Sequence, residues 1–461
     1  MPSASSTAGP AQAAAADRTQ TLITAPVLPL LVRFALPNMG ALLAAALASV
    51  SETIYVGRFG SGALAGLALV FPMVMMQSML SAGAMGSSVS STISRALGAG
   101  QTERANALAV HALWIGVAGG GLYMLAMLVL GEALYALLGG QGEILRHAVA
   151  YGQVAFLGSV FVWVVNTLSS VIRGAGRMTV PSVALLLISV AQVVISGALG
   201  LGWGPLPALG MRGVAAGQVV AYGVGAAALL AWLLAGRAGI QLPLRRTPVR
   251  METLRTILQA GAVACISPLQ TVLTILILTR LVAQFGPEAL AGYGIGTRLE
   301  FLLVPIAFAV GVASVPLVGM AMGAGQAARA RRVAWTAAAM AGAMLGAIGL
   351  VVTWWPDVWT RLFTQDAPVL ASTASYFQWA GPCYALFGVG LSLYFSSVAA
   401  GKAAGPVMAG TLRLVVVAAG GVALASAAAP AWTIFALVAL GMAAYGLATM
   451  AFVKSTPWGP R

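Results

Sequence analysis

Long apolar stretches separated by short polar gaps run along almost the whole chain. A stretch of about 20 apolar residues is long enough to cross a bilayer as a helix. Charged residues, Gly and Pro mark the gaps and divide the chain into twelve such stretches. The pattern therefore predicts an all-α polytopic membrane protein with twelve transmembrane helices. The expected helices cover residues 33–57, 62–90, 105–131, 147–171, 178–201, 210–236, 258–284, 290–320, 333–354, 374–398, 405–426 and 430–452.

The composition excludes a soluble protein, because only 7% of the residues are charged, whereas soluble domains contain about 25%. The net charge of +14 is spread over the gaps between apolar stretches instead of one polar face. Most basic residues fall on the side that the two termini share, which the positive-inside rule identifies as cytoplasmic. We therefore expect a multi-pass protein of a bacterial cytoplasmic (inner) membrane, with both termini cytoplasmic, in contact with the lipid bilayer and not with nucleic acid.

Polar segments divide the chain further. Residues 1–25 are rich in Ala, Ser and Thr and lack the order of a signal peptide, so we expect a disordered cytosolic tail. Residues 237–257 form the longest internal polar stretch and are expected to be a cytoplasmic linker. Residues 26–236 and 258–454 are then two six-helix lobes, followed by a cytosolic tail at 455–461.

The two lobes resemble each other in sequence. "GAGQTERA" at 98–105 matches "GAGQAARA" at 323–330, and "FGSGALAG" at 59–66 matches "FGPEALAG" at 285–292. Two halves with six helices each share one orientation, so a pseudo-two-fold axis along the membrane normal would relate them. This layout occurs among secondary transporters, in which the substrate lies between the halves near the midplane.

Motifs for other classes of protein are missing from the sequence. It contains two cysteines and two histidines, all far apart, which predicts no metal site. No P-loop, paired catalytic carboxylates or nucleophile with a base is recognisable, so we expect neither an enzyme nor a bound cofactor. Energy for transport would come from an ion gradient.

Glu52 is a carboxylate within the first apolar stretch, about five residues or roughly 8 Å from its end. Charged residues inside a membrane are costly and often functional, and burial disfavours the charged form of a carboxyl group. The repeat places Leu278 at the corresponding position of the second lobe. Glu52 is thus a candidate proton-coupling residue, or alternatively an interfacial residue that reaches water. Pro37 in the same helix is a candidate bending point.

Glu300 and Arg280 lie near the ends of adjacent helices of the second lobe and are expected to form a structural ion pair or a second coupling site. Other polar side chains within the apolar stretches are candidates for the substrate cavity or for contacts between helices. These are Gln77, Asn166, Gln270, Tyr293 and Gln378.

Several segments in this order resemble the multidrug and toxic compound extrusion family, the MATE transporters. "SETIYVGRFGSGALAG" at 51–66 is similar to the end of the family's first helix, with Glu52 in place of an aspartate. "RGAGRMTVP" at 173–181, "ALGMRGVAAG" at 208–217 and "AGYGIGTRLE" at 291–300 are similar to later motifs. The resemblance extends from about Leu28 to about Lys454.

The resemblance implies two six-helix bundles in a V around a central cavity. It also implies export of cationic or amphipathic small molecules, driven by inward flow of H⁺ or Na⁺, by a monomer. In one branch of the family an Asn and an Asp on the fifth helix face the first-helix carboxylate, and the matching residues here are Gln192 and Ser196. The acids of the sodium-coupled branch have no counterpart within 258–284 or 374–398.

The sequence therefore predicts an antiporter that exports cationic or amphipathic organic compounds by alternating access, coupled to H⁺ through Glu52, Gln192 and Ser196. Two alternatives remain open at this point. One is a Na⁺-coupled drug antiporter, and the other is a flippase for a lipid-linked precursor in the same superfamily.

Overall fold

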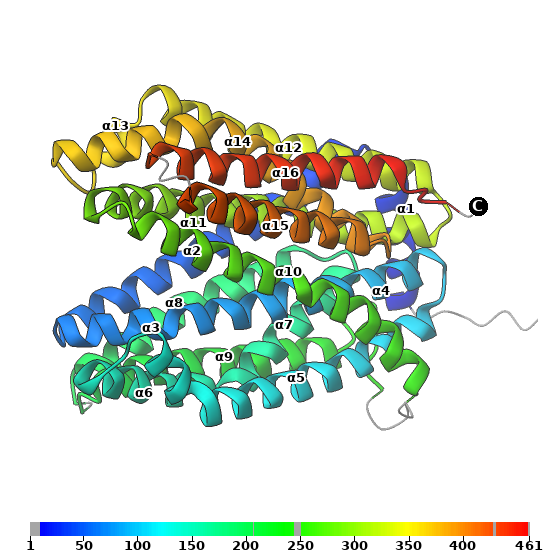
Figure 1. The fold of residues 1–461 in the computed structure, drawn as a ribbon. Coiled ribbons are helices and arrows are strands. Elements are labelled where there is room, and N and C mark those ends of the chain that lie inside the picture. The colour runs from blue at the N-terminus through cyan, green and yellow to red at the C-terminus, as the bar shows by residue number, and fades with distance from the viewer. Residues whose placement is uncertain (1–9, 206, 244–249, 427–429, 460–461) are drawn as a thin grey trace, which may run out of the picture. The chain divides into compact units, whose positions relative to one another are not determined.

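A computed structural model describes the chain except for residues 1–9, 206, 244–249, 427–429 and 460–461. All the regular secondary structure in the described residues is helical (Figure 1). In the part of the chain that the structure describes, eleven helices are long and apolar enough to cross a membrane, and a twelfth span is formed if the bent pair α6–α7 is counted as one. The expected all-α polytopic class is confirmed.

Contacts between residues divide the chain into two compact units, and each contains parts that are distant in sequence. The first unit comprises Met1–Ala25, Gly40–Gly261 and Gly319–Gly325, and the second comprises Pro26–Met39, Ala262–Val318 and Gln326–Arg461. The boundary inside the first membrane helix falls between Met39 and Gly40, shortly after Pro37. Three long helices, α2 (Val27–Gly57), α10 (Met251–Ala283) and α11 (Pro287–Gly323), therefore contribute to both units.

In the first unit, α7 packs against α4, α5 and α9, while α6 packs against α3, α5 and α9 and α8 packs against α9. The apolar run at 62–90 contains a π-helical turn, η1, and the run at 147–171 bends by 46° between α6 and α7. The remaining helices of this unit are α1 (Pro10–Thr24), α3 (Ser61–Ser78), η1 (Met79–Met85), α4 (Gly86–Gly98), α5 (Thr102–Leu137), α6 (Gly142–Leu157), α7 (Ser159–Gly174), α8 (Thr179–Leu201) and α9 (Gly210–Leu234).

In the second unit, α14 packs against both α12 and α16, and α16 packs against α15 (Figure 1). Tyr376, Phe377 and Phe435 are at most 2% exposed and belong to its apolar core. The other helices of this unit are α12 (Ala327–Trp354), α13 (Asp357–Thr360), α14 (Ala367–Ala399), α15 (Ala404–Ser426) and α16 (Trp432–Ser455).

The sequence repeat is also a repeat of turn geometry. Gly100 and Gly325 lie at matching positions and have φ angles of 73° and 74°, and Gly176 and Gly401 have φ angles of 76° and 74°. These angles belong to the left-handed region, which glycine enters without the steric cost that a Cβ atom would impose. The two halves thus use glycine in the turns that follow corresponding helices.

Two segments differ from the sequence expectations. Residues 1–25 were expected to be disordered. Residues 1–9 of this segment lie outside the described residues, but Pro10–Thr24 form α1, whose alanine-rich composition favours a helix and whose Leu22 is buried. The linker expected at 237–257 is shorter, because α10 already begins at Met251. Backbone N–H groups near both ends of that linker bond to α5: Gln241 to Asn106 and Arg250 to His111.

Candidate functional site

Glu52 lies on the buried face of α2, within the first unit, and is 7% exposed. Its Oε1 accepts a hydrogen bond from Gln192 Nε2 at 2.8 Å, and its Oε2 accepts one from the Tyr151 hydroxyl at 3.3 Å. Gln192 belongs to α8 and Tyr151 to α6. Three helices of the unit therefore meet at one carboxyl group.

Ser196 is placed one helical turn beyond Gln192, so that both side chains face Glu52. Its hydroxyl is 3.5 Å from Glu52 Oε1 but only 2.8 Å from the Val214 carbonyl oxygen of α9. A hydroxyl group has a single hydrogen to donate, and the shorter contact is the better hydrogen bond. Ser196 therefore ties α8 to α9 and leaves Gln192 and Tyr151 as the principal donors to Glu52.

No basic side chain neutralises Glu52 within the described residues, where the recorded ion pairs are His147–Glu143 and Arg361–Asp357. A carboxylate that is buried without a cation is expensive. Hydrogen bonds from Gln192 and Tyr151 offset part of this cost. The site is therefore chemically suited to take up a proton or a small cation.

Tyr151 is a site residue that the sequence reasoning missed. The repeat carries a signal for it, because Tyr376 lies 225 residues later in the second half. Tyr151 and Tyr376 are both buried, and each donates its hydroxyl hydrogen to a carboxyl group. The tyrosine is repeated, whereas the carboxyl group comes from α2 in the first unit and from α11 in the second.

Glu300 is the carboxyl group of the second unit. Its Oε1 accepts hydrogen bonds from the hydroxyls of Tyr376 and, at 3.4 Å, Tyr384, both on α14. Tyr293 packs edge-on against Tyr376, with ring centroids 5.7 Å apart. On α15 of the same unit, the Arg413 guanidinium lies 5.4 Å from the centroid of the Phe387 ring.

The expected ion pair between Glu300 and Arg280 is wrong for the described structure. Arg280 is exposed on α10, and no ion pair between the two is present among the described residues. Successive side chains on a helix point about 100° apart. Two residues at a similar depth in the membrane therefore need not face each other, and Arg280 does not pair with Glu300. The partners of Glu300 are the hydroxyls of Tyr376 and Tyr384 instead.

Removing the Glu300 carboxyl group is expected to destabilise the protein, because the hydroxyls of Tyr376 and Tyr384 would lose their acceptor. Glu300→Ala should lower the free energy of unfolding by about 2 kcal/mol. The control Arg280→Ala removes an exposed charge and should change it by less than about 0.5 kcal/mol. Both values are measurable by denaturant unfolding in detergent micelles, and equal losses in the two variants would contradict the structural role of the hydrogen bonds to Glu300.

The residues proposed for a substrate cavity have different surroundings. Asn166 Nδ2 donates to Ser81 Oγ of η1 at 2.8 Å, and Gln270 Nε2 donates to Thr411 Oγ1 at 2.7 Å, so both connect helices. Gln77 is buried, and its Nε2 has no hydrogen-bond partner among the described residues. Tyr293 belongs to the apolar core of the second unit, and Gln378 is exposed on α14.

Within the described residues, no group of three or more His, Cys, Asp or Glu side chains is placed to hold a metal ion. The features that remain are two repeated halves of membrane helices and one carboxyl group hydrogen-bonded by tyrosine in each. Such repeats, with polar groups inside the helical core, are typical of secondary membrane transporters.

Comparison with known proteins agrees with this class. The family model described as MatE matches residues 37–196 and 264–422, which together make up more than half of the chain. The chain therefore belongs to the MATE family of efflux transporters.

Relatives in sequence span most of the chain. It is 27% identical over 344 residues to a Thermotoga maritima protein named "Probable multidrug resistance protein NorM", which covers 74% of this chain and 73% of that protein. It is also 25% identical over 322 residues to the "FAD transporter" of Shewanella oneidensis, covering 68% and 69% of the two chains. The Staphylococcus aureus "Multidrug export protein MepA" is 24% identical over 275 residues, covering 59% and 60%.

Solved structures show the same fold. A MOP superfamily transporter from Pyrococcus furiosus has a TM-score of 0.86 at 20% identity, with 94% of this chain and 96% of that chain covered. A crystal structure of MATE in a bent conformation has a TM-score of 0.86 at 21% identity, with 95% and 96% covered.

Proposed function

We propose that this protein exports small cationic or amphipathic organic compounds by alternating access, in exchange for H⁺ that is carried by Glu52. The observation that carries the proposal is a buried carboxyl group with donors from two helices and no ion-pair partner among the residues that the structure describes. Two relatives are named as multidrug proteins, which supports the substrate class. The proposed location is a bacterial cytoplasmic membrane, with both termini in the cytoplasm and a monomer as the working unit.

A change in the charge of Glu52 alters the hydrogen bonds that it makes. The ionised group accepts from Gln192 and Tyr151 on opposite oxygens. Once protonated, the group becomes a donor at one oxygen and remains an acceptor at the other. A proton on Oε2 faces the Tyr151 hydroxyl, which then has to accept instead of donate, so protonation reverses the hydrogen bond between α2 and α6.

The course of α2 offers a way to transmit this change. Pro37 lies fifteen residues before Glu52, and its ring interrupts the hydrogen bonding of the helix. Residues up to Met39 pack with the second unit, while Glu52 packs with the first. We propose that the protonation state of Glu52 biases bending of α2 at Pro37, so that one helix links the site to both units.

Exchanging the driving ion tests the proposal. Protein in proteoliposomes should accumulate a fluorescent cationic dye when a pH gradient is imposed at equal Na⁺, and should not do so under a Na⁺ gradient at constant pH. Accumulation that follows Na⁺ alone would instead assign the Na⁺-coupled alternative. Vesicles without protein supply the background.

A second substrate class is favoured by one relative, the FAD transporter of Shewanella oneidensis. The same vesicles should therefore be offered a flavin dinucleotide beside the dye. Uptake of the flavin without uptake of the dye would replace the proposed substrate class while leaving the coupling scheme in place.

A further inference from the structure

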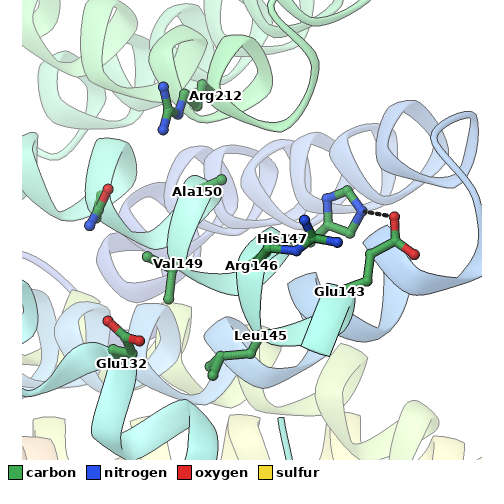
Figure 2. A pocket seen from close by; sticks show the side chains of 9 residues that line it. Glu132, Glu143, Leu145, Arg146, His147, Val149, Ala150 and Arg212 are labelled. Carbon is green, nitrogen blue, oxygen red and sulfur yellow. Dashed lines mark ion pairs between the residues drawn. The ribbon is translucent and has the colours of Figure 1, made fainter. Parts of the chain in front are cut away.

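A cavity opens on the first unit, and none of the residues of the Glu52 cluster lines it (Figure 2). Its volume is about 540 Å³, and it lies where the end of α5, the first half of α6 and the start of α9 meet. The polar side chains that line it carry both signs of charge. They are Glu132, Glu143, Arg146, His147, Gln153 and Arg212.

Most of these charged side chains have no partner in the described part of the chain. His147 Nε2 pairs with Glu143 at 3.7 Å. Glu132, Arg146 and Arg212 make no ion pair or hydrogen bond with any described residue. In Figure 2, Arg212 enters from α9, Arg146 from α6 and Glu132 from α5, around one open space. The cavity thus offers two free guanidinium groups and a free carboxylate to something outside the chain.

The charged residues of the cavity lie close to the ends of their helices, which places the cavity at the boundary between lipid head groups and acyl chains. Glu132 is five residues from the end of α5, Arg146 is four residues from the start of α6, and Arg212 is two from the start of α9. At 1.5 Å per residue these depths are roughly 3–8 Å, which matches a head-group layer of about 5–7 Å. Next to the cavity, Val129 and Leu130 are 68% and 53% exposed, as expected of side chains that face lipid tails.

We propose that this cavity binds the phosphoethanolamine head group of a membrane phospholipid. The phosphate would lie between Arg146 and Arg212, since guanidinium groups bind phosphate oxygens through paired hydrogen bonds. The primary ammonium group would approach Glu132, to which it can donate a hydrogen bond. A choline group has no hydrogen to donate, and a purely anionic head group would meet the carboxylates of Glu132 and Glu143 without compensation.

Bound lipid should stabilise the first turns of α6, the helix that also carries Tyr151. The test uses the purified full chain in detergent with added phosphatidylethanolamine, phosphatidylcholine or phosphatidylglycerol. Native mass spectrometry would give the fraction of protein that retains each lipid, and thermal unfolding would give the stabilisation. We expect retention of phosphatidylethanolamine to exceed that of phosphatidylcholine about fivefold, the size expected for one exposed charge pair.

Variants separate the two ends of the head group. Glu132→Gln should remove the preference for phosphatidylethanolamine over phosphatidylcholine, and Arg212→Gln should weaken retention of all three lipids. The control Arg361→Gln removes an exposed arginine that already pairs with Asp357 at 2.7 Å in the second unit, and it should retain lipids like the wild type. Thermal unfolding without lipid verifies that each variant is folded.

Three results would overturn the proposal. They are equal retention of phosphatidylethanolamine and phosphatidylcholine by the wild type, a preference that survives Glu132→Gln, and stronger retention of phosphatidylglycerol. Soluble glycerophosphoethanolamine distinguishes the sources of the head group. If it competes at the same concentration as the lipid, the ligand is a free phosphoester and not a membrane lipid.

Discussion

Glu52→Gln is expected to abolish dye accumulation under a pH gradient, down to the level of vesicles without protein. Glutamine has nearly the same size and keeps a carbonyl oxygen for the Tyr151 hydroxyl, but it cannot take up or release a proton. The substitution therefore separates the ionisable group from its role in packing. Dye accumulation in proteoliposomes measures the effect, and binding of the dye in detergent checks that the variant still recognises it.

The matched control for this experiment is Glu288→Gln. Glu288 is an exposed acid in the first turn of α11, and the same substitution there should leave accumulation at the wild-type rate. Wild-type accumulation by Glu52→Gln under the same gradient would show that another group carries the proton. Glu300 would then be the next carboxyl group to test, because it is the one bonded by the repeated tyrosine.

Gly217→Ala is expected to lower both the stability of the protein and its transport. A Cβ atom on Gly217 of α9 would lie 2.2 Å from Ser196 Oγ and 2.4 Å from the Ser196 backbone nitrogen. The backbone of α8 cannot yield as a flexible side chain would, so the helices must separate. Overpacking of this kind costs about 1–3 kcal/mol, and it would also displace Gln192, which shares a face of α8 with Ser196.

Gly121→Ala serves as the control for that substitution. A Cβ atom on Gly121 of α5 meets nothing within 4 Å, so alanine there should be neutral or stabilising by up to about 1 kcal/mol. Thermal unfolding of the two variants in detergent gives the comparison directly. Similar midpoints for Gly217→Ala and Gly121→Ala would contradict the close packing of α8 and α9 at the site.

The membrane helices were predictable because the signal is the hydropathy of a whole segment and does not depend on any single residue. A run of apolar residues must be helical in a bilayer, where every backbone polar group needs an internal partner. The repeated glycine turns, such as those at Gly100 and Gly325, also follow from sequence. By contrast, nothing in the run at 147–171 showed that the helix bends at Gly158, because composition remains apolar on both sides of the bend.

The candidate site was only partly predictable for a related reason. Glu52 is recognisable because it is a charge in an apolar segment, and the family resemblance pointed to Gln192 and Ser196. Tyr151 could not be told from an ordinary core tyrosine without its repeat partner. Arg280 was misassigned because an error of one residue in helical register rotates a side chain by about 100°, and hydropathy does not determine that rotation.

Counter-transport of protons tests the central claim most directly. Proteoliposomes that contain a pH-sensitive dye would receive the transported compound on one side, with no pH gradient at the start. The account predicts that wild-type protein moves protons opposite to the compound, and that Glu52→Gln moves none while Glu288→Gln behaves as the wild type. Proton movement of wild-type size in Glu52→Gln would contradict it.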